Sequence, residues 1–279
     1  MGGVSSSAEH VATGRGHPEA ANAHYYEDAD LVAVYERLGL RPVEAMLLDR
    51  YRDALSGRIL EVGCGSGRLT RPLLEIAAEV HGIDISAAMV GHCRRELGEG
   101  QFERRDMREV GAHPAAPFDG LIAPFNVLDA LGEDDRRRTL AGFHRVIVPG
   151  GLLIMSSHNR AFSPPGPIGE IVSKARARSF RGVAAGITRL PRRLSNHRRL
   201  RHSGIERTGY AIRNDGAHDF ALLHYYISRD EQESQLTEHG FELLECVDLD
   251  GEPVAPGARA ADCPELHYAA RGRPQDGRR

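Results

Sequence analysis

The chain contains no tryptophan and only one lysine, Lys174, among its 279 residues. Arginine supplies the other 35 basic residues, and the formal net charge at pH 7 is −3. A negative total excludes a molecule that binds nucleic acid through its overall charge. Alanine, glycine and arginine are abundant together, which indicates a GC-rich genome. Arginine content alone is therefore weak evidence for a phosphate-binding surface.

Long apolar runs and closely spaced metal ligands are also missing. No run of about 18 apolar residues is present, which excludes a transmembrane helix, and the N-terminus lacks the apolar core of a signal peptide. The four cysteines form no Cys-x-x-Cys pair, and the 14 histidines form no His-x-x-x-His pair. We therefore expect a reduced, cytoplasmic protein without disulfides, structural zinc or another bound metal.

Glycine, in contrast, is concentrated between a predicted buried strand and a predicted helix. The strand Ile59–Val62 is followed by Gly63, Gly65 and Gly67. Glycine is needed where the backbone takes a positive φ or lies close to a ligand. A strand, glycine turn and helix in this order present backbone N–H groups to a nucleoside or a carboxylate-bearing cofactor. The dinucleotide fingerprint would need glycine at position 68, which is Arg68, and the Gly-Lys-Ser/Thr of a phosphate loop is absent.

The segments that follow continue an alternating strand–helix order. A second strand over 79–84 ends in Asp84, whose carboxylate could accept both ribose hydroxyls of an adenosine. Ser86 is a predicted N-cap for a helix that runs to about Leu97. Further strands are predicted over 101–105 and 118–126. Residues 145–155 are interpreted as a helix end, a Pro-Gly-Gly turn and a fifth strand that runs over 152–156. A helix is predicted over 229–239, and two last strands over 241–249 and 265–271.

This ordered set of motifs resembles the class I S-adenosylmethionine (SAM)-dependent methyltransferases, over residues 58–158 and again from about His224. The resemblance implies an α/β fold: a Rossmann-like, seven-stranded sheet with helices on both faces and an antiparallel last strand. We expect residues 1–20 to be a disordered tail. Residues 21–160 and 221–279 would form the SAM-binding domain with an N-terminal helical cover (28–38 and 42–55). Residues 161–220 would be a basic helical lid inserted after the fifth strand, with helices over 168–182 and 191–202.

The resemblance also implies a set of cofactor-binding residues. Asp106 would face the adenine amino group while Met107 packs on the ring; a surface acid and a core methionine are the alternative. Glu61 could instead only tie the glycine loop together by accepting N–H bonds. The cofactor set is Tyr26, Glu61, Gly63, Cys64, Gly65, Gly67, Asp84, Ile85, Asp106, Met107, Pro124, Phe125 and Asn126.

The acceptor side is less strongly marked. His158 follows the predicted fifth strand and could act as the general base for a hydroxyl acceptor; a hydrogen-bonded loop histidine is the alternative. Asp129 could reach the pocket or merely cap a helix. Tyr226 completes the candidate catalytic set, with His224 and Tyr225 beside it.

The predicted function is that of a SAM-dependent methyltransferase (class EC 2.1.1) acting on oxygen or nitrogen of a small molecule in specialised-metabolite biosynthesis. Enzymes that methylate exocyclic amines of bases carry an Asn/Asp-Pro-Pro-aromatic motif where this chain reads Ala-Pro-Phe-Asn (123–126). An RNA or protein methyltransferase, and a SAM- or nucleoside-binding protein without methyl transfer, are the alternatives. The basic insertion could be a solvated lid, a site for an anionic acceptor, or a membrane or nucleic-acid surface. We expect a monomer or a homodimer.

Overall fold

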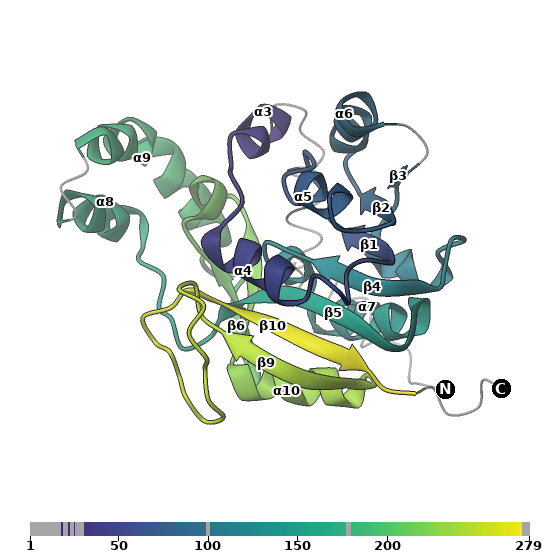
Figure 1. Ribbon diagram of the computed structural model, residues 1–279. Coiled ribbons are helices and arrows are strands. Elements are labelled where there is room, and N and C mark those ends of the chain that lie inside the picture. Colours follow the sequence, from purple (N-terminus) through teal and green to yellow (C-terminus); the bar gives the residue numbers. More distant parts are fainter. Residues whose placement is uncertain are drawn as a thin grey trace, which may run out of the picture.

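The computed structural model describes Pro18, Asn22, Tyr25 and residues 31–98, 101–176 and 180–274. Apart from Pro18, the predicted tail over residues 1–20 therefore lies outside the described residues. The predicted cofactor ligand Tyr26 lies outside them as well. The described residues form one ten-stranded sheet, and helices pack around it (Figure 1). The strands are β1 (Arg58–Val62), β2 (Glu79–Asp84), β3 (Phe102–Arg104), β4 (Phe118–Ala123), β5 (Ile147–Asn159), β6 (Ile205–Glu206), β7 (Tyr210–Asn214), β8 (Leu223–Ile227), β9 (Phe241–Val247) and β10 (Glu265–Gly272).

Seven of these strands form the predicted sheet, in the order β3-β2-β1-β4-β5-β10-β9. β1 to β5 pair in parallel, whereas β10 is antiparallel to both β5 and β9. Parallel strands need both faces covered, which is why β1 and β4 are almost continuously buried. The seven-stranded, Rossmann-like architecture predicted from the sequence is thus confirmed.

Helices cover the two faces of this sheet. Alternation along β5 separates the two cores: Leu153 and Met155 pack with α7 (Glu133–Val146) and α10 (Arg229–Glu238). Leu152 and Ile154 pack on the other face with α4 (Pro42–Arg50) and the helix after the glycine loop, α5 (Thr70–Leu74). The remaining helices near the glycine loop are α3 (Leu31–Glu36), α6 (Ala87–Leu97), and the 3₁₀ turns η1 (Met107–Ala112) and η2 (Val127–Ala130).

Two predicted helix N-caps agree with the structure. The Ser86 hydroxyl accepts the N–H of Met89 at the start of α6, and the Ser228 hydroxyl accepts the N–H of Glu231 at the start of α10. Each satisfies one of the donors that a helix N-terminus leaves without an intrahelical partner.

The insertion after β5 differs from the prediction. Its helices are α8 (Pro167–Arg176) and α9 (Phe180–Leu200), so the second helix begins eleven residues earlier than predicted and continues through Pro191. Both helices project away from the sheet (Figure 1). The rest of the insertion contains no further α-helix among the described residues: β6 pairs antiparallel with β7, β7 pairs antiparallel with β8, and the 3₁₀ turn η3 (Ala217–Phe220) connects β7 to β8.

β8 joins this extension to the main sheet. It pairs in parallel with β5 at His158 and Asn159, beyond the last pairing of β4 with β5 at Met155. β5 is therefore longer than predicted, and His158 lies within it and not after it. Within the described residues, no helix combines the length and apolar character needed to cross a bilayer.

Candidate functional site

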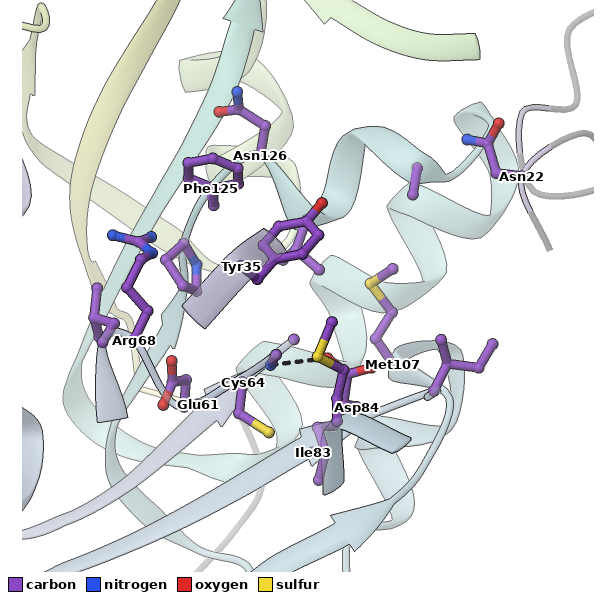
Figure 2. Close-up of a pocket in the computed structure, with 18 of the residues that line it drawn as sticks. Asn22, Tyr35, Glu61, Cys64, Arg68, Ile83, Asp84, Met107, Phe125 and Asn126 are labelled. Carbon is purple, nitrogen blue, oxygen red and sulfur yellow. Dashed lines mark hydrogen bonds between the residues drawn. The ribbon is translucent and has the colours of Figure 1, made fainter. Parts of the chain in front are cut away.

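A cavity of about 370 Å³ opens at the carboxyl ends of the parallel strands, where open α/β sheets place their ligands. Figure 2 shows Glu61, Cys64 and Asp84 on one side of it and Phe125 and Asn126 on another, with Tyr35 between them. The predicted cofactor residues that line it are Glu61, Gly63, Cys64, Gly65, Asp84, Ile85, Asp106, Met107, Pro124, Phe125 and Asn126.

The glycine loop has the backbone conformation that the sequence predicts. Gly63, Gly65 and Gly67 all have positive φ, at 73°, 53° and 79°. A Cβ on Gly63 would lie 2.5 Å from Val127, and a Cβ on Gly67 would lie 2.5 Å from Leu97, whereas a Cβ on Gly65 would meet nothing within 4 Å. Gly63 and Gly67 therefore permit close packing behind the loop, while Gly65 leaves space beside the cavity. Of the three glycines, Gly67 does not line the cavity.

Asp84, at the end of β2, is fixed by the loop that it faces. Its Oδ2 accepts the N–H of Gly65 at 2.9 Å (the dashed line in Figure 2), and its Oδ1 accepts the N–H of Ser86 at 2.8 Å. Burial raises the pKa of this carboxyl, and the two backbone donors oppose the rise. The arrangement leaves an oriented carboxylate at the cavity wall.

Glu61, at the end of β1, is almost completely buried. Its Oε2 accepts a hydrogen bond from the Thr70 hydroxyl at 2.5 Å. Burial raises the pKa of Glu61 to about 8, although the bond from Thr70 acts in the opposite direction. A positively charged ligand group at this carboxyl would offset the cost of burying its negative charge.

The loop also holds a buried polar atom without a partner. The Ser66 hydroxyl has no hydrogen-bond partner among the described residues, and Ser66 lines the cavity. Buried polar groups are normally satisfied, so such an atom indicates a ligand or water. Together with Glu61, Asp84 and the open space beside Gly65, it fits a ligand that has a ribose and a charged amino-acid end, as SAM has.

Asp106 and Met107 are the predicted residues for the adenine end of the cofactor. Both line the cavity, but Asp106 caps η1 and accepts hydrogen bonds from the backbone N–H and the guanidinium of Arg108. Its carboxylate is therefore partly engaged by the protein.

The end of β4 is held in an uncommon conformation. Phe125 and Asn126 have φ of 55° and 58°, a region that non-glycine residues rarely occupy and that is enriched at functional sites. Two guanidiniums contact the Phe125 ring, with Arg41 at 4.3 Å and Arg68 at 4.9 Å from its centroid. These cation–π contacts place the ring against the cavity, as Figure 2 shows for Phe125 and Arg68.

His158 also lines the cavity, and a buried carboxylate orients it. Oδ2 of Asp129 lies 2.7 Å from Nδ1 of His158 and accepts the backbone N–H of the same residue at 2.6 Å. Burial of the ring lowers the pKa of His158, but the hydrogen bond and negative charge of Asp129 outweigh this effect, so the pKa is raised above its ordinary value. Nε2 lies 3.4 Å from Nδ2 of Asn126, which also lines the cavity.

Asp129 itself does not reach the cavity. Its side chain is fully buried, and Oδ1 accepts hydrogen bonds from Arg136 and from the Ser157 hydroxyl, each at 2.7 Å. The candidate role of direct acceptor contact is thus not available to Asp129 in this structure, because its carboxylate is enclosed by these donors and by His158.

Tyr226 is likewise behind the cavity wall. Its ring lies 4.9 Å from the His158 ring, and its hydroxyl donates to Oδ2 of Asp215 at 2.7 Å. His224, two residues earlier on the same face of β8, lines the cavity. Tyr225 faces the opposite side, where it bonds Glu133, because successive strand residues alternate.

Asp215, His158 and His224 form a cluster whose nearest side-chain donor and acceptor atoms lie within 4.8 Å of one another. Oδ2 of Asp215 is bonded to Nδ1 of His224 at 2.8 Å as well as to the Tyr226 hydroxyl. We therefore interpret the cluster as a hydrogen-bonded network. The expectation that the protein binds no metal stays a prediction.

Several cavity residues carry no local sequence signal. Tyr35 reads only as part of an apolar helix face, and its hydroxyl lies 3.1 Å from Nε2 of His218. His218 belongs to η3, 183 residues away, where His218, Asp219 and Phe220 all have positive φ. No spacing rule joins such distant segments.

The arginines of the cavity have acidic partners. Arg41 pairs with Glu265, Arg68 with Glu44, Arg105 with Glu103, and Arg108 with Asp106 and Asp135. Among the described residues, no arginine of the insertion lines the cavity. The cavity therefore gives no support to the interpretation that the basic insertion binds an anionic acceptor.

Comparison with known proteins matches the segment that builds this cavity. Residues 59–151 match a family model described as a methyltransferase domain. A ubiquinone biosynthesis O-methyltransferase from Aromatoleum aromaticum is 30% identical over 127 residues, which are 44% of this chain and 53% of that protein. Aklanonic acid methyltransferase DauC from a Streptomyces species is 28% identical over 138 residues, which are 45% of this chain and 60% of that protein. The chain thus matches little more than half the length of these relatives.

Solved structures resemble the chain over more of its length. The CcbJ methyltransferase from Streptomyces caelestis has a TM-score of 0.57 at 16% identity, covering 90% of this chain and 98% of that one. A SAM-dependent methyltransferase from Clostridium acetobutylicum has a TM-score of 0.54 at 11% identity, with the same coverage. At these identities the likeness shows the fold.

Proposed function

We propose that the chain is a class I SAM-dependent methyltransferase and that it transfers a methyl group from SAM to a hydroxyl oxygen of a small molecule. The observation that carries the choice of a hydroxyl is the pairing of Asp129 with His158 at 2.7 Å beside the cavity. A hydroxyl oxygen becomes a good nucleophile only when a base removes its proton, whereas a neutral amine needs no base.

The cofactor half of the cavity is supplied by the first two strands. Asp84 would accept the ribose hydroxyls, Glu61 would face the charged amino-acid end, and Met107 would pack against the adenine. The backbone of Pro124 to Asn126 would line the sulfonium side. When bound, SAM supplies a methyl group on a positively charged sulfur, which leaves as a neutral thioether.

On the acceptor side, Nε2 of His158 would take the proton of the acceptor hydroxyl as its oxygen attacks the methyl carbon. Asp129 holds Nδ1, so it selects the tautomer that leaves Nε2 able to accept a proton. The buried negative charge of Asp129 then stabilises the imidazolium that forms. Asp129 is therefore proposed as a positioning residue, and His158 as the catalytic base.

The size of the cavity supports a small acceptor. A cavity of about 370 Å³ lies in the size range of small-molecule binding sites. A pathway for specialised metabolites is consistent with the names of relatives such as the aklanonic acid methyltransferase, and we propose it as the biological setting.

The test is methyl transfer from methyl-labelled SAM to a panel of small phenols, alcohols and amines, followed by mass spectrometry of the products. The proposal expects labelled O-methyl products, and His158→Ala should abolish most of the transfer while leaving SAM affinity nearly intact. Transfer only to amines would replace the hydroxyl assignment, and transfer only to RNA or protein would overturn the proposal as a whole. Absence of SAM binding by calorimetry would also overturn it.

A further inference from the structure

The rings of His224 and Tyr226 flank the ring of His158, and both side chains are hydrogen-bonded to the carboxylate of Asp215. The His224 ring lies 5.1 Å from the His158 ring, and the Tyr226 ring lies 4.9 Å from it, each tilted by about 30°. Nδ1 of His224 and the hydroxyl of Tyr226 both bind Oδ2 of Asp215, at 2.8 and 2.7 Å. The packing around His158 therefore converges on Asp215.

Asp215 is a charged group in a buried position. Its exposed fraction is 4%, and its second oxygen accepts the N–H of Ala217 at 2.9 Å. Burial alone would raise the pKa of this carboxyl, but the charges of His224 and His158 and the bonded donors lower it well below its ordinary range. Asp215 is thus ionised at neutral pH and lies within 4.8 Å of the nearest ring nitrogen of His158.

The position of Asp215 is set by the insertion and not by the methyltransferase core. It follows β7 directly, and the turn that begins there is held by α9. Nε of Arg193 donates to Oδ1 of Asp219 at 3.0 Å, and the amide of Asn196 donates to the carbonyl oxygen of Asp219 at 3.0 Å. Asn214, just before Asp215, donates to the carbonyls of Phe220 and Leu222.

The charged and titratable groups that face His158 come from four elements. Asp129 belongs to η2, Asp215 to the turn after β7, and Glu265 to β10; His224 and Tyr226 come from β8. Glu265 is paired with Arg41, and Asp129 is paired with Arg136, so cations already offset both carboxylates. Within the described residues, the partners of Asp215 are two aromatic side chains and a backbone N–H, so arginine does not offset its charge.

We propose that Asp215 is a second positioning residue for the His158 base: its charge stabilises the protonated imidazole, and its two side-chain hydrogen bonds fix the rings that flank it. The inference rests on the proposed function, since it concerns the base of that reaction. The insertion then contributes to the proton transfer and is more than a cover over the acceptor.

The charge and the tethering can be separated by two variants. Asp215→Asn keeps the shape and one oxygen that can accept the Tyr226 hydroxyl, but removes the charge. Tyr226→Phe removes one tether and keeps the charge. We expect Asp215→Asn to lower the pKa of His158, measured by NMR titration of the ring, by about one unit, and to move the acidic limb of the pH profile of kcat/KM by the same amount. Tyr226→Phe should leave the His158 pKa within a few tenths of a unit and act mainly on turnover.

A measurement on the unmodified protein keeps the test decisive if Asp215→Asn does not fold. The carboxyl carbon of Asp215, followed by NMR, should show an inflection at the pKa measured for His158. Absence of this inflection, or an unchanged His158 pKa in folded Asp215→Asn, overturns the proposal. Failure of the proposed function is separate: full turnover in His158→Ala would remove the base itself, whatever the titrations show.

Discussion

The backbone N–H of Gly65 donates to Oδ2 of Asp84 at 2.9 Å, across 19 residues of sequence. This bond joins the glycine loop after β1 to the acidic end of β2, the two features from which the cofactor site was predicted. The same carboxylate therefore orients the loop and faces the cavity.

Replacement of Asp84 should affect cofactor binding more than any other single change in the loop region. Asp84→Ala removes two charge-assisted hydrogen bonds to ribose, each worth about 1.5–3 kcal/mol, so SAM should bind at least about 100-fold more weakly. Calorimetry measures this directly. Asp250→Ala, at an exposed turn, is the control; equal affinity in both variants would remove Asp84 from the site.

Two glycine substitutions separate backbone strain from close packing. Gly63 and Gly150 have similar positive φ, 73° and 80°, but only a Cβ on Gly63 would collide with a neighbour, Val127. Both changes to alanine should cost about 1–2 kcal/mol of unfolding free energy through strain, and Gly63→Ala should cost further because of the clash. Chemical denaturation measures both, and Val127→Ala should restore part of the Gly63→Ala loss. No difference between the two glycines would contradict the packing role of Gly63.

The pH dependence of the reaction should report His158. Its pKa is raised above the ordinary value of 6.5, and only the neutral imidazole can accept a proton. For a hydroxyl acceptor, kcat/KM should therefore fall about tenfold per pH unit below this raised pKa and level off above it. His158→Ala should abolish the inflection and cut turnover by about 10²–10⁴-fold. A loss nearer tenfold would point to an amine acceptor, for which the residue only positions.

Asp129→Asn tests the orientation of the base. The amide cannot hold Nδ1–H of His158 as a carboxylate does, so the wrong tautomer becomes accessible and the stabilising charge is lost. We expect turnover to fall by about 10²-fold or more and the kinetic pKa to fall toward its ordinary value, while SAM affinity is retained. Asp134→Asn, at an exposed position of α7, serves as the control. An unchanged pH profile would show that Asp129 acts only through folding.

The insertion should become more resistant to proteolysis when both ligands are bound. His218 lines the cavity, and the next residue, Asp219, is bonded to Arg193 of α9, so a ligand that contacts His218 also stabilises the helix. Trypsin cleavage within residues 161–220, mapped by mass spectrometry, should slow with SAM and acceptor. Arg193→Ala should lose much of this protection, and equal cleavage with and without ligands would argue for a rigid, independent module.

The cofactor side of the site could be predicted from sequence because its signals are local. A buried strand, three glycines and an acid after one more strand specify a loop whose conformation depends on residues that are neighbours in sequence. The same is true of the N-caps at Ser86 and Ser228. Each of these features follows from backbone chemistry over a few residues, and the structure has each of them.

The acceptor side could be predicted only in part. His158 was chosen for its place at the end of β5, but the partnership with Asp129 depends on packing between segments 29 residues apart. β6 and β7 were missed because both strands are short and lie in a segment whose arginine-rich pattern favours helix. Asp215 and His218 follow β7, so they could not be recognised without that pairing. The pairing also identifies β8 as a strand, and the alternation along β8 turns Tyr225 away from the cavity.

The length of β5 has a consequence for how this protein can change its specificity. The strand continues past the end of β4, and His158 and Asn159 form its junction with β8. The proposed base thus lies in a strand that pairs with β4, β8 and β10, while His218, which lines the same cavity, comes from the insertion. An exchange of residues 161–220 for a related insertion would leave the base in its strand but would have to keep Asp215 and its bonds to His224 and Tyr226. With that condition, this segment is the natural unit for engineering a new acceptor.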